Sequence, residues 1–94
     1  MKGFTKIQEG EISHNDGYTI ALKRGKIMYS DNEGILHMPC EDLEEHSVVI
    51  YVGEIELWAD NTKISNTKKK EIVERIKLGM DFLKIKCGID RKKY

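Results

Sequence analysis

Hydrophobic and polar residues alternate in short runs over the first half of the chain. Tyr18, Ile20 and Leu22 alternate with polar or small residues between positions 18 and 23, which is typical of a strand with one face in water. Shorter runs of the same kind predict further strands at residues 4–7, 11–13, 27–29 and 35–38. The clearest turn signal is HNDG at residues 14–17, where Asp-Gly favours a tight hairpin because glycine tolerates a positive φ.

The hydrophobic pattern changes at Pro39. Proline lacks the amide hydrogen that a strand donates to its neighbour, so we expect the strand at 35–38 to end there. The acidic run CEDLEE, residues 40–45, is interpreted as a short helical turn or an acidic loop, with Leu43 as its one inward anchor.

The longest β-favouring run is SVVIYVGEIELW, residues 47–58, which holds the only tryptophan. From Val48 to Val52 it is apolar at successive positions, a pattern typical of a central strand covered on both faces. After a bulge at Gly53, two apolar residues alternate with two glutamates, which predicts a strand with one wet face. Trp58 is expected either in the core or at an interface.

A helical period is present from Asn66 or Thr67 to Lys84. The apolar stripe that would pack on the sheet spans about 100° and consists of Ile72, Val73, Ile76, Met80 and Leu83. Leu78 and Phe82 lie off this stripe. We expect the N-terminal strand or the C-terminal tail to cover them, and an exposed apolar contact is the alternative.

Lysines mark both ends of this helix. Lys68, Lys69 and Lys70 fall in its first turn, where the helix dipole disfavours cations. We interpret them as a solvated basic turn, with partner binding as the alternative. After the helix, Ile85 and Cys87 alternate with lysines, which predicts a short final edge strand.

These elements predict an α+β fold. It consists of an antiparallel β-sheet of about 5–6 strands with one long C-terminal helix packed on one face, and a short final edge strand. A chain of 94 residues makes a single domain over residues 1–94, since this length lies within the usual range for one domain. We expect residues 88–94, which end in a basic run, to form a mobile tail.

The cysteines and the lack of long apolar runs predict a cytoplasmic protein. Cys40 and Cys87 do not make a disulfide framework and are interpreted as reduced thiols of a cytoplasmic protein. The N-terminal residues lack the apolar core of a signal peptide. The longest uninterrupted apolar run is five residues, which is too short to span a membrane.

A net charge of zero hides a strong segregation of charge along the chain. Residues 1–30 carry five basic and three acidic groups, residues 31–60 carry nine acidic groups and no Lys or Arg, and residues 61–94 carry eleven basic and four acidic groups. The segment charges are therefore +2, −9 and +7. Such blocks indicate charged partners, unless strands from different blocks become neighbours on folding and neutralise one another.

Catalytic and metal-binding motifs are missing from the sequence. The chain has no G-x-S-x-G, no Gly-rich phosphate loop and no H-E-x-x-H, the motifs that would indicate such chemistry. His14 is expected in an exposed turn. His37 and Cys40 have H-x-x-C spacing without further zinc ligands nearby, and His46 has no assisting group. We therefore expect no enzyme activity, no metal and no cofactor.

The acidic block suits a partner with a basic cleft, such as a nuclease. Carboxylates speed the encounter with a basic protein, and a tryptophan supplies a binding hot spot. The expected interface comprises Glu41, Asp42, Glu44, Glu45, Glu54, Glu56, Trp58 and Asp60. The alternative is a small nucleic-acid or regulatory binding module that uses the basic C-terminal third, although such proteins normally carry a clear net positive charge.

Three stretches of the sequence form a recognisable combination. They are VVIYVGEIELW, the pair Ile64-Ser65 before the helix, and DFLKI at residues 81–85. Together they resemble the immunity protein 74 family of bacterial polymorphic toxin and contact-dependent inhibition systems, over about residues 47–87 and less clearly over G-Y-T-I at 17–20. Two positions depart from the family pattern: A-D-N follows the tryptophan where the family has prolines, and Lys84 stands where glycine is expected.

The resemblance implies a role without naming a toxin. It implies a cytoplasmic protein that binds a cognate toxin domain and neutralises it by forming a stoichiometric complex, with no catalytic residues of its own. The expected partner is thus a protein and not a membrane, nucleic acid is the less favoured partner, and weak self-association stays open.

Overall fold

The structure, a computed structural model, describes residues 3–43 and 47–90. The described residues form one seven-stranded sheet in chain order, with strands β1 (Phe4–Gln8), β2 (Glu11–His14), β3 (Tyr18–Lys23), β4 (Lys26–Asp31), β5 (Gly34–Leu43), β6 (Ser47–Tyr51) and β7 (Lys86–Asp90). A 3₁₀ turn, η1 (Val52–Glu54), and the helix α1 (Asn66–Phe82) lie between β6 and β7. Neighbouring strands are antiparallel except β6 and β7, which run parallel because α1 carries the chain back along the sheet. The predicted α+β fold with a short final edge strand is confirmed.

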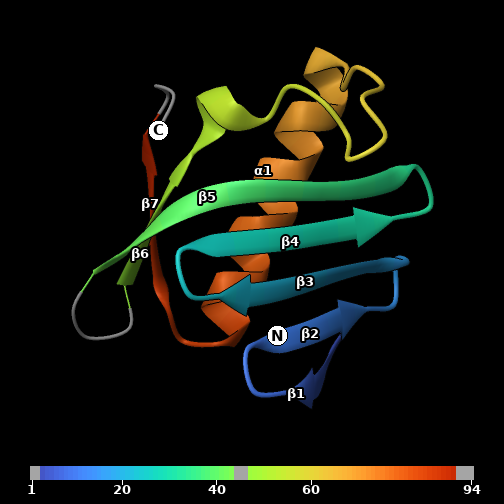
Figure 1. Cartoon of the computed structure of the whole chain (residues 1–94). Coiled ribbons are helices and arrows are strands. Elements are labelled where there is room, and N and C mark those ends of the chain that lie inside the picture. Colours follow the sequence, from blue (N-terminus) through green and yellow to red (C-terminus); the bar gives the residue numbers. More distant parts are fainter. Residues whose placement is uncertain (1–2, 44–46, 91–94) are drawn as a thin grey trace.

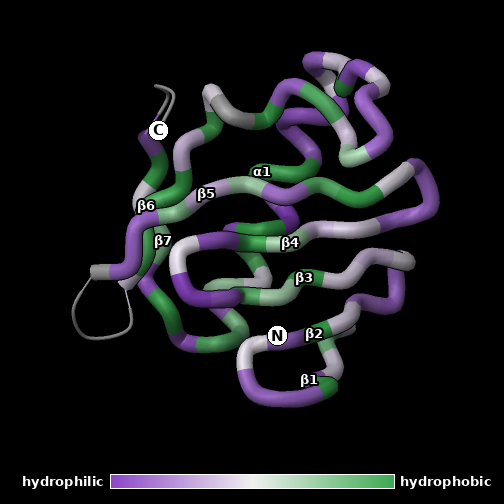
Figure 2. The backbone as a smooth tube through the Cα atoms, in the orientation of Figure 1, coloured by the Kyte–Doolittle hydropathy of each residue, from purple (hydrophilic) through white to green (hydrophobic). Residues whose placement is uncertain are grey.

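The sheet has one covered and one uncovered face. α1 lies across one side, which we call the inner face, and within the described residues no helix lies on the opposite, outer face (Figure 1). Side chains alternate between the two faces, so that Tyr18 and Ile20 of β3 are buried and Thr19 between them is half-buried. Hydrophobic and hydrophilic positions alternate along the strands, and the hairpin turns are hydrophilic (Figure 2).

The core lies between the inner face and α1. Its buried members are Ile12, Tyr18, Ile20, Ile27, Tyr29, Leu36, Met38, Cys40, Val48, Ile50, Ile55, Trp58, Ile64, Ile72, Ile76 and Met80. α1 packs tightly on the sheet at Gly79, because a Cβ there would lie 2.7 Å from Cδ1 of Ile20. Any larger side chain would force the helix and the sheet apart or displace buried atoms.

α1 begins and ends close to the predicted positions. Ser65 Oγ accepts a hydrogen bond at 3.1 Å from the amide three residues further on, as an N-cap does. At the other end, the amides of Lys84 and Ile85 donate to the carbonyls of Asp81 and Met80, which is the pattern of a Schellman motif. Lys84 has a φ of 61°, so the position where the family pattern has glycine is left-handed and is occupied by lysine.

Pro39 does not end its strand, so that prediction is wrong. β5 continues to Leu43, pairing with β4 as far as Pro39 and with β6 from Cys40 onward. The Cys40 amide donates to the Gly25 carbonyl on the β4 side. Because successive amides point to opposite sides of a strand, the missing hydrogen of Pro39 faces the β6 side just before that pairing begins, and no ladder bond is lost.

The acidic run after Pro39 is also a strand where it is described. Cys40–Leu43 pairs with β6, so the predicted helical turn or acidic loop is wrong for these residues. Residues 44–46 and the side chain of Leu43 lie outside the described part of the chain.

The stretch 47–58 is not one central strand. β6 covers only its first five residues, buries every second side chain and lies next to the edge strand β7. The chain then turns through η1 in place of the predicted bulge at Gly53, because it must cross to the helix layer before returning parallel to β6. Ile55 is 1% exposed and Leu57 is 46% exposed, so the predicted alternation after Gly53 is wrong as well.

The ends of the chain cover part of the helix. Phe82 stacks on Phe4 of β1 with ring centroids 5.2 Å apart, so the N-terminal strand covers it, in agreement with one of the predicted alternatives. Leu78 remains 42% exposed. Gly88 to Asp90 belong to β7, so the tail predicted from residue 88 is wrong for these three positions.

Candidate functional site

The basic and acidic blocks of the sequence meet between the helix and the sheet. Lys68 Nζ, in the first turn of α1, lies 2.7 Å from Asp31 Oδ2 and 2.6 Å from Glu33 Oε2. Glu71, on the same helix, is 3.0 Å away. The side chain of Lys68 is 11% exposed and that of Asp31 is 2% exposed, so the prediction of a solvated basic turn is wrong for Lys68.

Arg75 extends this arrangement through Tyr29. Its Nη1 donates a hydrogen bond to the Tyr29 hydroxyl at 2.7 Å, and that hydroxyl donates to Asp31 Oδ2 at 2.6 Å. Its Nη2 pairs with Glu71 at 3.0 Å. The guanidinium also lies 4.5 Å from the ring centre of Tyr18, where cation–π attraction is favourable. We refer to Tyr29, Asp31, Glu33, Lys68, Glu71 and Arg75 as the charge cluster.

Burial and pairing act in opposite directions within the charge cluster. Burial raises the pKa of Asp31, but hydrogen bonds from Lys68 and Tyr29 outweigh it and leave that pKa below its ordinary value. Burial lowers the pKa of Lys68, but three carboxylates raise it above its ordinary value. Both groups are therefore charged at neutral pH. The cluster fastens α1 to β4 and has no unpaired group poised for catalysis.

Two residues of the predicted acidic interface lie at the end of β5. Glu41 and Asp42 are both exposed. Glu41 Oε2 accepts a hydrogen bond from the Tyr51 hydroxyl at 2.6 Å. Asp42 Oδ2 accepts one from the Gly25 amide at 3.0 Å and so closes the β3–β4 turn. Glu41 is thus held in place on the surface, whereas Asp42 serves the fold.

Asp60 lies at the opposite end of β5. The Ala59 amide donates to the Ile35 carbonyl at 2.7 Å, which fixes this loop beside the start of the strand. The strand length between Ile35 and Glu41 is about 20 Å. Asp60 Oδ1 accepts hydrogen bonds from the Thr62 hydroxyl and amide at 2.6 and 3.0 Å, and these bonds lower the pKa of Asp60. Asp60 therefore shapes its own loop.

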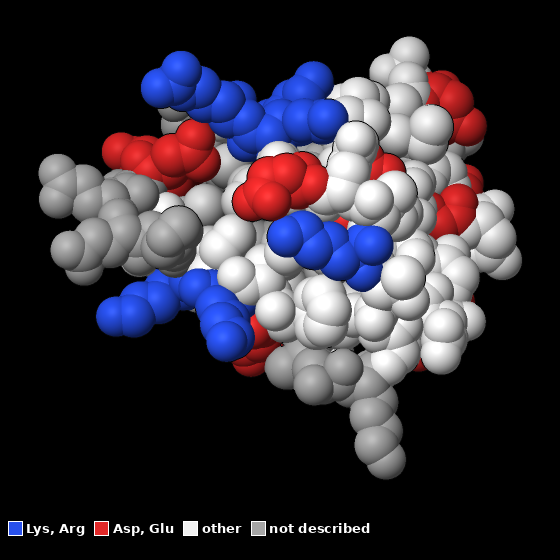
Figure 3. Space-filling model, turned by 90° about the horizontal axis from the view of Figure 1, so that it is seen from below, with Lys and Arg blue, Asp and Glu red and all other residues white. Residues whose placement is uncertain are grey.

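The predicted acidic interface is consequently not one patch. Glu56 is exposed on the loop after η1, and Glu44, Glu45 and the side chain of Glu54 lie outside the described part of the chain. Figure 3 shows basic and acidic side chains next to one another on the face seen from below. The alternative that sequence blocks intermix on folding is supported, most directly by the charge cluster.

Trp58 is a core residue, which corrects its assignment to the partner interface. It is 6% exposed and stacks with Tyr29 at a centroid distance of 6.4 Å. Its ring lies over Gly34, where a Cβ would come within 3.0 Å of the indole. The hydrogen bond from its amide to the Thr62 carbonyl, at 2.9 Å, folds the loop back over the sheet. The indole is therefore not available as an exposed hot spot.

The outer face of the sheet displays a surface that sequence reasoning missed. The strand register aligns two cross-strand rows, Glu11, Ala21, Met28 and His37 in one and Ser13, Thr19, Ser30 and Ile35 in the other. Ile35 is 46% exposed, and a shallow hollow of about 230 Å³ lies beside it. The rows carry few charged side chains, as the core of a protein–protein interface does, and Met28 and Ile35 are their larger apolar side chains. The alternation along the predicted strands indicates two faces of different polarity. It does not show which face the helix leaves uncovered.

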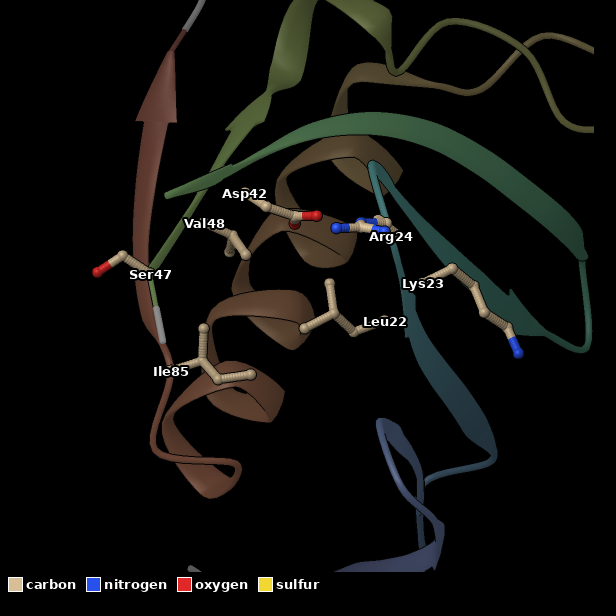
Figure 4. A pocket seen from close by; sticks show the side chains of 7 residues that line it. All are labelled: Leu22, Lys23, Arg24, Asp42, Ser47, Val48 and Ile85. Carbon is tan, nitrogen blue, oxygen red and sulfur yellow. The ribbon is translucent and has the colours of Figure 1, made fainter. Parts of the chain in front are cut away.

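A larger hollow of about 440 Å³ opens where the β3–β4 turn approaches β6 and the end of α1. Leu22, Val48 and Ile85 form its apolar walls, and Arg24 and Asp42 extend toward one another across it (Figure 4). The wall residues hold no nucleophile beside a base, so we assign no chemistry to this hollow.

The histidines and cysteines that the sequence singles out form no chemical site where they are described. The prediction that His14 is exposed is wrong: its side chain is 15% exposed, and its ring packs on Phe4 and Tyr18 at 4.6 and 4.8 Å. Burial raises the pKa of the Cys40 thiol to about 11, so this thiol stays protonated at neutral pH. Within residues 3–43 and 47–90, no group of three or more His, Cys, Asp or Glu side chains is arranged to hold a metal ion.

Comparison with protein-family models found no match, and comparisons with curated proteins and with solved structures found none either. The resemblance to the immunity protein 74 family therefore depends on the sequence motifs alone. In the part of the chain that the structure describes, no helix is long and apolar enough to cross a membrane.

Proposed function

We propose that this chain is a non-catalytic protein that binds a toxin domain through the outer face of its sheet and neutralises it by stoichiometric binding in the cytoplasm. The observation that carries the proposal is the uncovered outer face, with Ile35 46% exposed and Met28 in the adjoining row. An apolar side chain that stands in water gains free energy when a partner covers it.

The end of β5 supplies the polar side of this surface. Glu41 projects from the outer face, and its hydrogen bond with Tyr51 (2.6 Å) restricts both side chains. A restricted carboxylate loses less conformational entropy on binding than a free one. Glu41 therefore favours a partner with a basic group opposite β5. The ring of Tyr51, beside Glu41, takes the hot-spot role that the buried Trp58 does not fill.

The class of partner rests on the resemblance described above. A toxin-neutralising protein needs a surface and no active site of its own, and the outer face is such a surface. The toxin domain to test is the C-terminal domain of the protein encoded immediately upstream, because immunity and toxin genes of the resembled family lie together.

The test compares two exposed apolar residues on different sides of the molecule. Ile35→Glu places a charge in the outer face, and Leu78→Glu places the same charge on the helix, where the exposed fraction is similar at 42% against 46%. Ile35→Glu should weaken toxin binding at least about 10-fold and abolish growth protection, and Leu78→Glu should change neither. Equal effects of the two substitutions would remove the outer face as the interface.

A second comparison tests the electrostatic contribution of Glu41 to toxin binding. Glu41→Lys should slow association with a basic toxin domain and reduce its dependence on salt. Glu74→Lys, on the helix that covers the opposite face of the sheet, should leave both nearly unchanged because charges that far apart are screened at physiological salt. If the two charge reversals act alike, Glu41 has no special role.

A further inference from the structure

A groove on the helix side of the molecule is unlike the outer face in shape and in charge. It has a volume of about 660 Å³ and lies between α1, η1 and β7. Val52, Ile55, Val73 and Ile89 line its apolar floor. Of these, Ile55 is buried and the other three are half-buried, so a ligand in the groove would cover apolar surface that is still wet.

The rim of this groove is basic. Among its described lining residues, the charged side chains are Lys69, Lys70, Lys77 and Glu74. The only ion pair among these described residues is Lys77–Glu74, at 3.9 Å, and two positive charges remain in excess. Cations gathered along an apolar floor attract a ligand that carries carboxylates next to apolar groups.

The edge strand β7 borders the same groove. Within the described chain, β7 pairs only with β6, and it stands at the margin of the sheet (Figure 1), with Ile89 lining the groove. An extended peptide beside such a strand points every second side chain to the same side. A peptide in which apolar and acidic residues alternate would therefore place apolar side chains on the floor of the groove and carboxylates at its basic rim.

We propose that this groove binds an extended acidic segment of a partner protein, with apolar side chains on the Val52, Val73 and Ile89 floor and carboxylates on Lys69 and Lys70. Nucleic acid is the other polyanion that lysines attract. It binds tightly where aromatic or arginine side chains stack on its bases, and the described lining of the groove contains neither. The inference does not depend on the proposed toxin-binding role of the outer face.

The test uses the full chain and three labelled probes in fluorescence anisotropy at about 0.15 M salt. The probes are a peptide of about ten residues with alternating leucine and glutamate, the same peptide with glutamine in place of glutamate, and a single-stranded thymidine oligonucleotide. The acidic peptide should bind at least about 10-fold more tightly than either of the other two. No binding of the acidic peptide at about 1 mM, or tighter binding of the oligonucleotide, overturns the proposal.

Matched double variants locate the site. Lys69→Glu with Lys70→Glu should weaken peptide binding at least about 10-fold, whereas Lys23→Glu with Lys26→Glu, which changes net charge equally at the β3–β4 turn, should weaken it no more than about 2-fold. The milder pair Lys69→Gln with Lys70→Gln should give an intermediate loss and guards against misfolding of the first variant. An equal loss in the rim and turn variants overturns the proposal.

Discussion

On one flank of α1, Lys68 and Arg75 reach into the charge cluster and touch Asp31, whose side chain is 2% exposed. On the other flank, Lys69, Lys70 and Lys77 stand around an apolar groove. The first flank faces β4, and the second faces β7. Adjacent lysines in one helical turn therefore have opposite roles, since one is enclosed by carboxylates and the next stays available to a ligand.

The comparison shows that the residues packed opposite a lysine or arginine of α1, and not the residue type, determine whether its charge is buried or exposed. Lys68 is enclosed because β4 and its turn bring Asp31 and Glu33 beside the first turn of the helix. Removing one member of a buried ion cluster leaves its partners with fewer opposite charges in a place that water reaches poorly, which costs more than removing an exposed charge. The two flanks should consequently respond to mutation in opposite ways.

The largest expected effect is on the β4 side. Asp31→Ala removes the most buried carboxylate of the charge cluster, so the Tyr29 hydroxyl loses its acceptor and the two cations keep only the more exposed Glu33 and Glu71. It should lower the free energy of unfolding by about 3 kcal/mol, measured by urea denaturation. Glu74→Ala, the carboxylate on the groove flank, is the control and should change it by less than about 0.5 kcal/mol. Similar losses from both would show that the cluster is no more structural than the groove.

Arg75 and Lys77 give the next largest contrast. Arg75→Lys keeps the charge but loses the second hydrogen bond and the packing on Tyr18, and should cost about 1–2 kcal/mol in thermal or chemical unfolding. Lys77→Arg, the reverse exchange on the groove flank, should be neutral within about 0.5 kcal/mol. A neutral Arg75→Lys variant would contradict the assigned geometry.

Low pH should weaken the contact between α1 and β4 by protonating Asp31. Its pKa is lower in the folded protein than in the unfolded chain, so its stabilising contribution is present above about pH 4, the unfolded value, and is lost as the pH falls through the folded value. In Asp31→Asn the free energy of unfolding should fall less steeply below pH 4 than in the unaltered protein, by up to about 1.4 kcal/mol per pH unit. Equal slopes in urea titrations at several pH values would contradict this.

The smallest effect concerns the end of α1, which both flanks share. Lys84 holds a left-handed conformation with φ 61°, so Lys84→Gly should stabilise the protein by about 0.5–1 kcal/mol, raising its melting temperature. Lys86→Gly, in the adjoining strand, should instead destabilise it. In the Lys84→Gly variant, the substitutions described above should change the free energy of unfolding by the same amounts as in the unaltered protein.

The parts of the fold that local chemistry determines could be predicted from the sequence. The Asp16-Gly17 hairpin, the start of α1 near Asn66 and its apolar stripe depend on neighbours within a few residues. Pro39 misled the prediction because its cost depends on which side of the strand lacks a partner, and that is a property of the sheet. The early end of β6 likewise follows from the crossover to the helix layer.

The candidate sites were less accessible to sequence reasoning because they depend on distant contacts. Nine carboxylates in one block suggested one acidic surface, but Asp31 and Glu33 pair with Lys68. Among the other described carboxylates, Glu41 and Asp60 lie at opposite ends of β5. Trp58 is turned inward by hydrogen bonds within its loop, which composition does not reveal. The outer face and the groove depend on which side of the sheet α1 packs, and that packing involves residues far apart in the sequence, such as Gly79 and Ile20.

The most direct test measures two quantities on two matched variants, Lys68→Met and Lys70→Met. For each, the free energy of unfolding and the dissociation constant of the acidic peptide are determined. Lys68→Met should lose about 2–4 kcal/mol of stability while its folded form binds the peptide within about 2-fold of the unaltered protein; Lys70→Met should keep its stability within about 0.5 kcal/mol and bind at least about 3-fold more weakly. Equal stability losses, or equal losses of affinity, would contradict the division of α1 into a structural and a binding flank.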